Sequence, residues 1–333
     1  MTISGSNFRS QKKAELHAHL NGCVPTHVVQ QLLEKFNVTI PEGYDPARDL
    51  QVTKPVAGLA EYFKPWHLLK LLPIGQACLN RMTSSALAVL REDGIDYVEL
   101  RNSPFSIATV NGISLEECLN WMTDSLALAR EESGVDARLI LGLSRLDCNP
   151  TQARKLLDAI RTVNNRELVV GLDLSGDEDN PIDSSLSRYF REGKDEMGLG
   201  VSIHAGETFL AANVDWAIHE CNADRIGHAL AAAAEPRLLD LLATKQVCVE
   251  VCLYSNFLTG KVTTIENHPV RNFIDSRVPF VLCADNPSVH NMPLSEEYAL
   301  FALHFPDNDV FGTMYETQLK HSFGKRLRSD DKV

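Results

Sequence analysis

The sequence predicts an α/β fold, a (β/α)8 (TIM) barrel, and three observations lead to this prediction. Eight short apolar runs alternate with helical patterns along the chain, and 333 residues is a usual length for one such barrel. The apolar runs are continuous, as in parallel strands that are buried on both faces. A doubly wound sheet is the alternative, but the sequence contains no P-loop and no G-x-G-x-x-G after a strand. We therefore expect a single domain over residues 1–333.

Each strand is predicted from a short run that is rich in apolar and β-branched residues. The first strand lies within 14–22, and the others cover 95–101, 137–143, 168–174, 200–204, 225–228, 246–252 and 279–285. Each helix is predicted from apolar residues that recur on one face, as Val28, Val29 and Leu32 do. The helical patterns cover 25–33, 76–91, 115–132, 151–162, 184–194, 211–220, 235–244, 269–275, 294–305 and 309–323.

Charge and cysteine content limit the possible partners and the compartment. The net charge of −12 opposes binding to nucleic acid and to anionic membranes, so a small molecule is the expected partner. Eight cysteines without a C-x-x-C pair predict reduced, buried thiols. The N-terminus lacks signal-peptide character, and no apolar stretch has membrane-spanning length. We expect a cytoplasmic protein, whose oligomeric state the sequence leaves open.

His17 and His19 stand two residues apart in the first predicted strand. Strand side chains alternate between faces, so both imidazoles project from one face, about 7 Å apart along the chain. Two imidazoles on one face can bind one metal ion. The alternative is a pair of half-buried histidines with ordinary hydrogen bonds, and the other strand ends must decide between the two.

The ends of other predicted strands carry matching chemical groups. In a barrel these ends meet on one face, where the active site lies. His204 and Asp285, added to the first two histidines, complete a set of three imidazoles and one carboxylate, which suits zinc and leaves a position for water. Zinc lowers the pKa of such a water towards neutrality and so creates a nucleophile. Glu207 and His228 form the kind of acid–base pair that a reaction needs when it protonates the substrate during attack.

Seven motifs resemble those of the adenosine deaminase family of metal-dependent (β/α)8 hydrolases, in the family's order. They are Glu15–Gly22 (ELHAHLNG), Tyr97–Pro104 (YVELRNSP), Leu174–Glu178 (LSGDE), His204–Glu207 (HAGE), Arg225–His228 (RIGH), Glu250–Asn256 (EVCLYSN) and Asp285–Pro287 (DNP). The resemblance implies zinc-dependent hydrolytic deamination of adenosine or a close 6-aminopurine nucleoside, which gives a 6-oxopurine and ammonia.

The resemblance also implies roles for the residues at the strand ends. One zinc ion would be held by His17, His19, His204 and Asp285. Glu207 would donate a proton to ring N1 of the purine. His228 would orient and deprotonate the attacking water, and Asp285 would also hold that water.

The resemblance also implies that four further residues contact the substrate. Gly176 would present its backbone N–H to ring N3, Asn21 would meet the hydroxyls of the sugar, and Asn286 would face ring N7. Trp66 belongs to an insertion after the first strand, with an irregular stretch over 37–54 and a predicted helix over 57–72. This aromatic helix resembles the family's helical lid, and an ordinary helix that covers the core is the alternative.

Two residues depart from the commonest family pattern, and both bear on the substrate. Asn21 stands where members that bind free adenosine commonly have Asp or Glu, and Asn also occurs there in the branch that acts on N6-methyl-AMP. Asn286 stands where many members have a second Asp, and its amide can still donate. His290, in the loop after the last strand, could touch the substrate, but a solvated loop histidine is the expectation.

Several alternatives therefore remain open. The substrate could be adenine, an N6-substituted AMP or 6-aminodeoxyfutalosine, or the chain could be an inactive barrel that serves for binding. Deamination within a polynucleotide is disfavoured, because the H-x-E and P-C-x-x-C signature of the deaminases that act there is absent.

Overall fold

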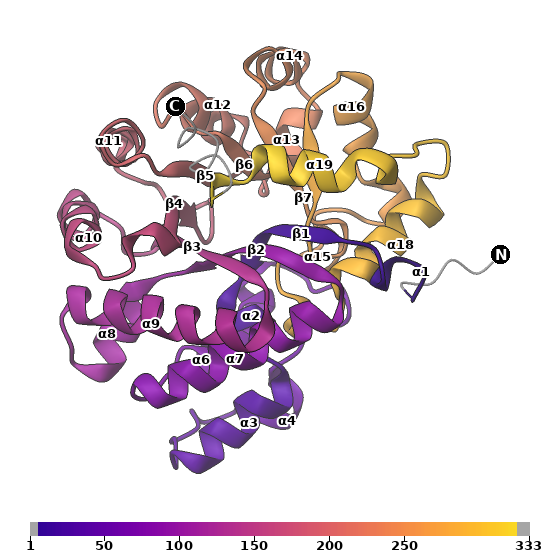
Figure 1. The fold of residues 1–333 in the computed structure, drawn as a ribbon. Coiled ribbons are helices and arrows are strands. Elements are labelled where there is room, and N and C mark those ends of the chain that lie inside the picture. Colours follow the sequence, from indigo (N-terminus) through magenta and orange to yellow (C-terminus); the bar gives the residue numbers. More distant parts are fainter. Residues whose placement is uncertain (1–5, 325–333) are drawn as a thin grey trace.

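Eight parallel strands form the centre of the molecule and lie side by side in chain order (Figure 1). The computed structural model describes residues 6–324; residues 1–5, part of the segment without signal-peptide character, and residues 325–333 lie outside this range. The strands are β1 (Lys13–His19), β2 (Ile95–Asn102), β3 (Asp136–Ser144), β4 (Val169–Ser175), β5 (Gly200–Ala205), β6 (Arg225–His228), β7 (Cys248–Val251) and β8 (Phe280–Leu282). Each of them overlaps a predicted strand.

The barrel is nearly closed, because the chain that follows β8 reaches β1. The backbone N–H of Asp285 donates to the oxygen of His17, and its oxygen accepts from the N–H of His19, both at 2.9 Å. The carboxylate of Glu15 joins the same seam by accepting hydrogen bonds from the backbone N–H groups of His17 and Ala284, each at 2.8 Å. The prediction of a (β/α)8 barrel is thus confirmed in its strands and in the helices around them.

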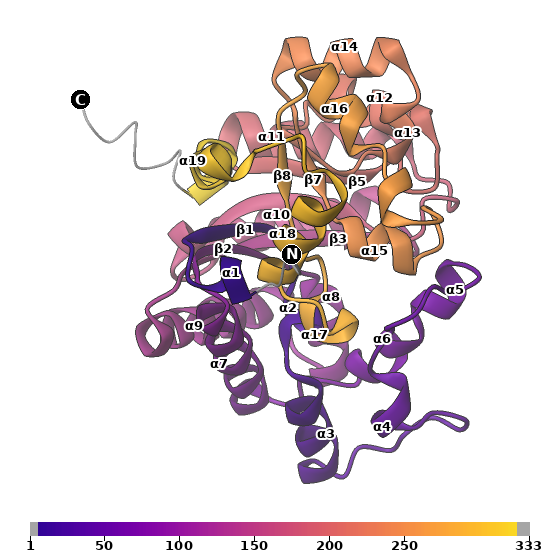
Figure 2. The same ribbon diagram turned by 90° about the vertical axis from the view of Figure 1, so that its right-hand side faces the viewer.

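Helices surround the strands on the outside (Figures 1 and 2). Those of eight or more residues are α3 (Thr26–Lys35), α7 (Gln76–Glu92), α8 (Pro104–Asn111), α9 (Leu115–Ser133), α10 (Pro150–Thr162), α11 (Ser187–Met197), α12 (Ala211–His219), α14 (Pro236–Lys245), α18 (Leu294–His304) and α19 (Phe311–His321). The shorter ones are α1 (Ser6–Arg9), α2 (Leu20–Cys23), α4 (Pro46–Asp49), α5 (Leu59–Tyr62), α6 (Lys64–Leu69), α13 (Leu230–Ala233), α15 (Leu253–Leu258), α16 (Val270–Asp275) and α17 (Pro287–His290), with 3₁₀ turns η1 (Arg166–Leu168), η2 (Ser184–Leu186) and η3 (Ile265–Asn267). Within residues 6–324, no helix is long and apolar enough to cross a membrane.

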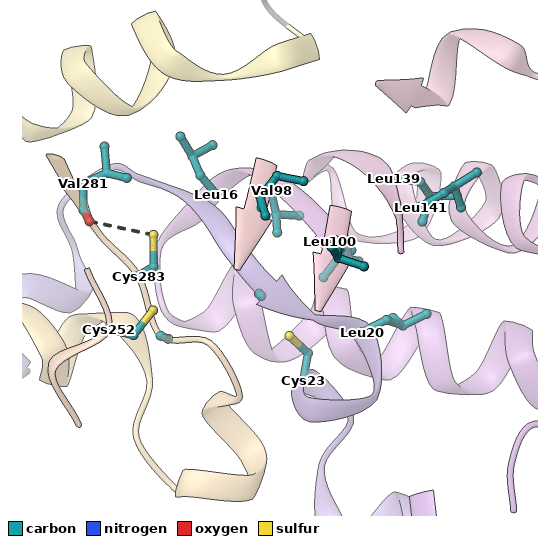
Figure 3. Close-up of a cluster of buried hydrophobic side chains, with 14 of the residues drawn as sticks. Leu16, Leu20, Cys23, Val98, Leu100, Leu139, Leu141, Cys252, Val281 and Cys283 are labelled. Atoms are coloured by element: carbon teal, nitrogen blue, oxygen red, sulfur yellow. Dashed lines mark hydrogen bonds between the residues drawn. The ribbon is translucent and has the colours of Figure 1, made fainter. Parts of the chain in front are cut away.

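The apolar core lies between the strands and these helices. Alternation along β1 places Leu16 on the face opposite to His17, and Leu16 joins Val98 and Leu139 in a fully buried cluster (Figure 3). Cys283 belongs to the same cluster, and its thiol points at the backbone oxygen of Val281. All eight cysteines are free, and seven of them are buried, as their spacing predicted.

The strands are buried on both faces, as predicted, but the inner face of the barrel carries charged side chains. Arg225 and Glu250 are fully buried, and Nε of Arg225 donates to Oε1 of Glu250 at 2.6 Å. Nη1 of Arg225 donates to Oε2 of Glu99 at 2.7 Å. Arg101 donates to Glu250 and lies 3.3 Å from Oδ1 of Asp173. Buried charges require such partners, and this network occupies the space beneath the strand ends.

The insertion after β1 differs from the predicted single helix over 57–72. It forms α5 and α6, which are separated at Phe63. Pro65 lies in the first turn of α6; a proline has no N–H to donate and its ring clashes with the preceding turn, so α5 cannot continue through it. The segment contacts the strand-end face, because the N–H of Val56 donates to the oxygen of Leu258 at 2.9 Å.

Candidate metal centre and active site

The four residues predicted as metal ligands meet at one end of the barrel. His17 and His19 lie at the C-terminal end of β1, His204 lies near the end of β5, and Asp285 follows β8. Nε2 of His19 is 3.3 Å from Nε2 of His204 and 3.3 Å from Oδ1 of Asp285. Nε2 of His17 is 3.6 Å from the same Oδ1. Four donor atoms from three distant parts of the chain therefore face one another. Two overlapping groups have ligand atoms close enough to hold a metal ion, His17 with His19 and Asp285, and His17 with His204 and His228.

Two buried carboxylates orient the histidines from behind. Nδ1 of His17 is 2.7 Å from Oε2 of Glu250, and Nδ1 of His204 is 2.9 Å from Oδ1 of Asp173. Each carboxylate accepts a hydrogen bond from Nδ1–H, so the lone pair of each Nε2 points at the common centre. Nε2 of His17 is buried and has no hydrogen-bond partner. Burial opposes the ionisation of Glu250. The guanidinium groups of Arg101 and Arg225 outweigh this effect and hold the pKa of Glu250 below its usual range.

Asp285 and His228 have unusual backbone conformations. Their φ angles are +61° and +66°, in the left-handed region that residues with side chains rarely adopt. Such strain persists only where surrounding contacts enforce it, and it concentrates at functional sites. The carboxylate of Asp285 is fixed on both sides, because Oγ of Ser255 donates to Oδ2 and Nδ2 of Asn286 donates to Oδ1, each at 2.7 Å.

Glu207 and His228 lie together beside the ligand cluster. Oε2 of Glu207 is 3.9 Å from Nε2 of His228. The loop that carries Glu207 is held by Glu178, whose carboxylate accepts hydrogen bonds from the N–H groups of Gly206 (2.7 Å) and Glu207 (2.5 Å). Burial raises the pKa of Glu207, which favours its protonated form and suits a proton donor.

Three of the four predicted substrate residues directly follow or lie close behind strands β1, β4 and β8, and the fourth is in α6. Asn21 is in α2, directly after β1, and its buried Oδ1 has no hydrogen-bond partner. Gly176 follows β4 with φ +104°, where any other residue would be strained, whereas the space for a Cβ is ordinary. Nδ2 of Asn286 donates to the hydroxyl of Tyr62 at 3.2 Å. Trp66 packs on Tyr62 with ring centroids 5.4 Å apart, so it is linked to the centre through that ring.

His290 is buried, and the prediction that it is solvated is wrong. Only 1% of the residue is exposed, and its Nε2 lies 2.8 Å from the hydroxyl of Tyr62. Burial lowers the pKa of His290 to about 4, so its ring is neutral at physiological pH. The insertion covers this part of the chain, and a short helix, α17, turns the side chain inwards. Pattern alone could not show this, because the covering residue is 228 positions away.

Helix α15 brings further buried polar groups to the site. It carries Ser255, which bonds the ligand Asp285, and Asn256, whose Nδ2 is 3.1 Å from Nδ1 of His228. The helix is supported from α18 by Glu297, whose Oε1 accepts a hydrogen bond from the N–H of Tyr254 at 3.1 Å. Both residues belong to the Glu250–Asn256 motif, from which the sequence predicts no role for either.

Burial raises the pKa of Glu297 to about 8, against about 4.3 in an unfolded chain. The folded state therefore binds more protons than the unfolded state between these values, and the protein loses stability as the pH rises through this window. Glu297→Gln removes the titration. We expect the free energy of unfolding of the variant, relative to wild type, to increase from about pH 4.5 to about pH 8 in urea unfolding experiments.

Glu316→Gln, at an exposed position of α19, is the matched control for the loss of one carboxylate. A difference between Glu297→Gln and wild type that is constant with pH, or that grows as the pH falls, would contradict the assignment.

Comparison with known proteins agrees with this geometry. A family model described as adenosine deaminase matches residues 12–326. Adenosine deaminase from Vibrio parahaemolyticus is 31% identical over 295 residues, 86% of each chain, and that from Edwardsiella ictaluri is 30% identical over 290 residues, 85% of each.

Solved structures share the fold. An adenine deaminase from Arthrobacter aurescens superposes with a TM-score of 0.84 at 21% identity, covering 96% of both chains. An amidohydrolase from Burkholderia ambifaria with bound Zn gives 0.83 at 20% identity, covering 98% of this chain and 90% of the other. The N6-methyl-AMP deaminase of Arabidopsis thaliana gives 0.78 at 24% identity, covering 99% of both. With the family model matching nearly the whole chain, the conclusion is that the protein belongs to the adenosine deaminase family and is an aminohydrolase.

Proposed function

We propose that the protein is a zinc-dependent aminohydrolase that converts adenosine, or a close 6-aminopurine nucleoside, to the 6-oxopurine and ammonia. The observation that carries this proposal is the meeting of three imidazole nitrogens and one carboxylate oxygen beside Glu207 and His228. Membership of the adenosine deaminase family supports the reaction class, and the named relatives support a purine.

The donor set fits zinc. Ligand atoms bound about 2.0–2.1 Å from one zinc ion lie about 3.3 Å from one another at tetrahedral angles, and zinc can take a further ligand, such as water, by expanding to five-coordination. The separations between Nε2 of His19 and its two neighbours are both 3.3 Å, and that between His17 and Asp285 is 3.6 Å. The buried, unpartnered Nε2 of His17 needs an acceptor of its lone pair, which an ion would provide. Zinc held there would lower the pKa of the attacking water towards neutrality.

Side chains of the protein have separate roles in the reaction of the purine. Glu207, whose protonated form is favoured by burial, donates a proton to ring N1 and makes C6 electrophilic. His228 orients the water that attacks C6, and Asp285, fixed by Ser255, holds the same water. The C6–O bond forms and the C6–N bond breaks. One proton of the water ends on the amino group, which leaves as ammonia, and the other restores Glu207, whose own proton stays on ring N1 of the 6-oxopurine. Gly176, Asn21, Asn286 and Trp66 hold the purine and its sugar, and we propose that α5 and α6 act as a lid that excludes water.

The test is an ammonia-release and absorbance assay of the zinc-loaded protein on six compounds in parallel. These are adenosine, 2′-deoxyadenosine, adenine, AMP, N6-methyl-AMP and 6-aminodeoxyfutalosine. We expect the fastest release from a nucleoside, and none after treatment with a chelator. Release from none of the six by protein with bound metal would contradict the purine assignment.

An N6-substituted AMP is the second candidate substrate, and Asn21 is the observation that favours it. A neutral amide with a free, buried oxygen lies where a carboxylate would repel a phosphate. Asn21→Asp separates the two candidates. If adenosine is the substrate, we expect its kcat/KM to stay within about tenfold of wild type; a nucleotide substrate would lose more than about tenfold, through like-charge repulsion. Steady-state kinetics on adenosine and on N6-methyl-AMP decide between them.

A further inference from the structure

A chain of three buried hydrogen bonds runs from the backbone of α16 to His228. The N–H of Val270 donates to Nδ1 of His268 at 3.1 Å. Nε2 of His268 is 3.1 Å from Oδ1 of Asn256, and Nδ2 of Asn256 is 3.1 Å from Nδ1 of His228. All three side chains are at most 2% exposed, so water does not compete for these contacts.

The direction of every bond in this chain follows from its first donor. A backbone N–H can only donate, so Nδ1 of His268 accepts and carries no proton. Burial lowers the pKa of His268 to about 3, so its neutral ring carries its single proton on Nε2. That N–H donates to the oxygen of Asn256, which turns the amide NH₂ towards His228. Nδ1 of His228 therefore accepts a hydrogen bond and has no proton of its own.

We infer that Asn256 and His268 are positioning residues that keep the proton of neutral His228 on Nε2. This nitrogen is the one that faces Glu207, at 3.9 Å from its Oε2. A ring with a proton on Nε2 can donate a hydrogen bond to the attacking water, but it cannot accept a proton from it at that atom. His228 thus orients the water as a donor, and the proton of the water passes to the carboxylate of Asp285, which holds the same water. This consequence rests on the proposed function; the position of the proton does not.

The proton position can be measured without any substrate. In ¹⁵N spectra of histidine-labelled, zinc-loaded protein, a ring nitrogen that carries a proton is well separated from one that does not. The signals of His228 are assigned by their absence from the spectrum of His228→Gln. We expect Nδ1 without a proton and Nε2 with one. The reverse pattern would overturn the inference.

Asn256→Asp reverses the polarity of the central link with minimal change of shape. A carboxylate accepts from both neighbours, so we expect the proton of His228 to move to Nδ1. For the wrong tautomer we expect kcat to fall on the order of 10²-fold with little change in KM. Asn267→Asp makes the same chemical change at an exposed position next to His268 and should leave kcat unchanged.

Each outcome of this pair of measurements is informative. A moved proton with unchanged kcat would overturn the role of the tautomer, and a proton that stays on Nε2 would overturn the role of Asn256. If Asn256→Asp does not fold, the wild-type spectrum alone decides. If wild type releases no ammonia from any purine, the proposed function fails, but the spectrum still tests the positioning chain.

Discussion

Glu207→Gln is expected to keep the fold and the bound metal and to lose kcat by a factor on the order of 10² or more. Glutamine has the same shape as glutamate but has no acidic proton for ring N1. The backbone contacts that hold this loop do not involve the changed side chain, because Glu178 accepts from the N–H groups of Gly206 and Glu207. The loss should therefore fall on the chemical step. It is measured by steady-state kinetics, with circular dichroism and metal content determined on the same sample.

Asp179→Asn is a suitable control for Glu207→Gln. Asp179 is an exposed carboxylate in the loop after β4, on the same end of the barrel, and no part of the proposed mechanism uses it. We expect near wild-type kinetics from this variant. If Glu207→Gln were to behave in the same way, Glu207 would not be the proton donor.

Glu250→Gln is expected to reduce the free energy of unfolding by about 3–5 kcal/mol, because it leaves buried positive charge uncompensated. The carboxylate of Glu250 accepts hydrogen bonds from Nε of Arg225 at 2.6 Å and from Nδ1 of His17 at 2.7 Å, and it forms an ion pair with Arg101. Both oxygens of Glu250 accept hydrogen bonds, so the NH₂ group of a glutamine in either position would face another donor and could not replace the lost bond. His17 also loses the partner that orients it, so we expect metal affinity to fall about 10- to 100-fold.

Urea unfolding and metal titration measure these two effects separately. Glu192→Gln is the matched control, because Glu192 pairs with Arg154 and Arg161 on the partly exposed surface of α10 and α11. A surface pair contributes at most about 1 kcal/mol. Equal destabilisation by the two variants would show that the charged interior network does not stabilise the fold.

Most strands and helices could be predicted from local sequence patterns. Where the structure differs from the prediction, the backbone gives the physical cause. The eight strands were predictable because each is a short apolar run between turns. The last one, predicted over 279–285, ends at Leu282, because the backbone leaves the ladder and turns to φ +61° at Asp285. The helix predicted over 57–72 is divided because Pro65 interrupts the hydrogen bonding of the backbone.

The site was predictable where a rule of the fold brings residues together, and not elsewhere. Strand ends of a barrel share one face, so the meeting of His17, His204 and Asp285 could be expected. The roles of Glu250 and Asn256 could not, because their contacts join residues far apart in sequence; Glu250 lies 233 positions from His17. A charged residue that alternates with apolar ones in a short strand was the only local signal of that inner network.

The most direct test of the account is a metal titration of the apoprotein with the best substrate of the six-compound assay. Protein is freed of metal with a chelator, zinc is added in steps, and bound zinc and ammonia release are measured on the same samples. We expect ammonia release to rise in proportion to bound zinc and to reach its plateau at one ion per chain, and we expect no recovery of His17→Ala, which lacks one ligand. Full ammonia release by the metal-free protein would contradict it.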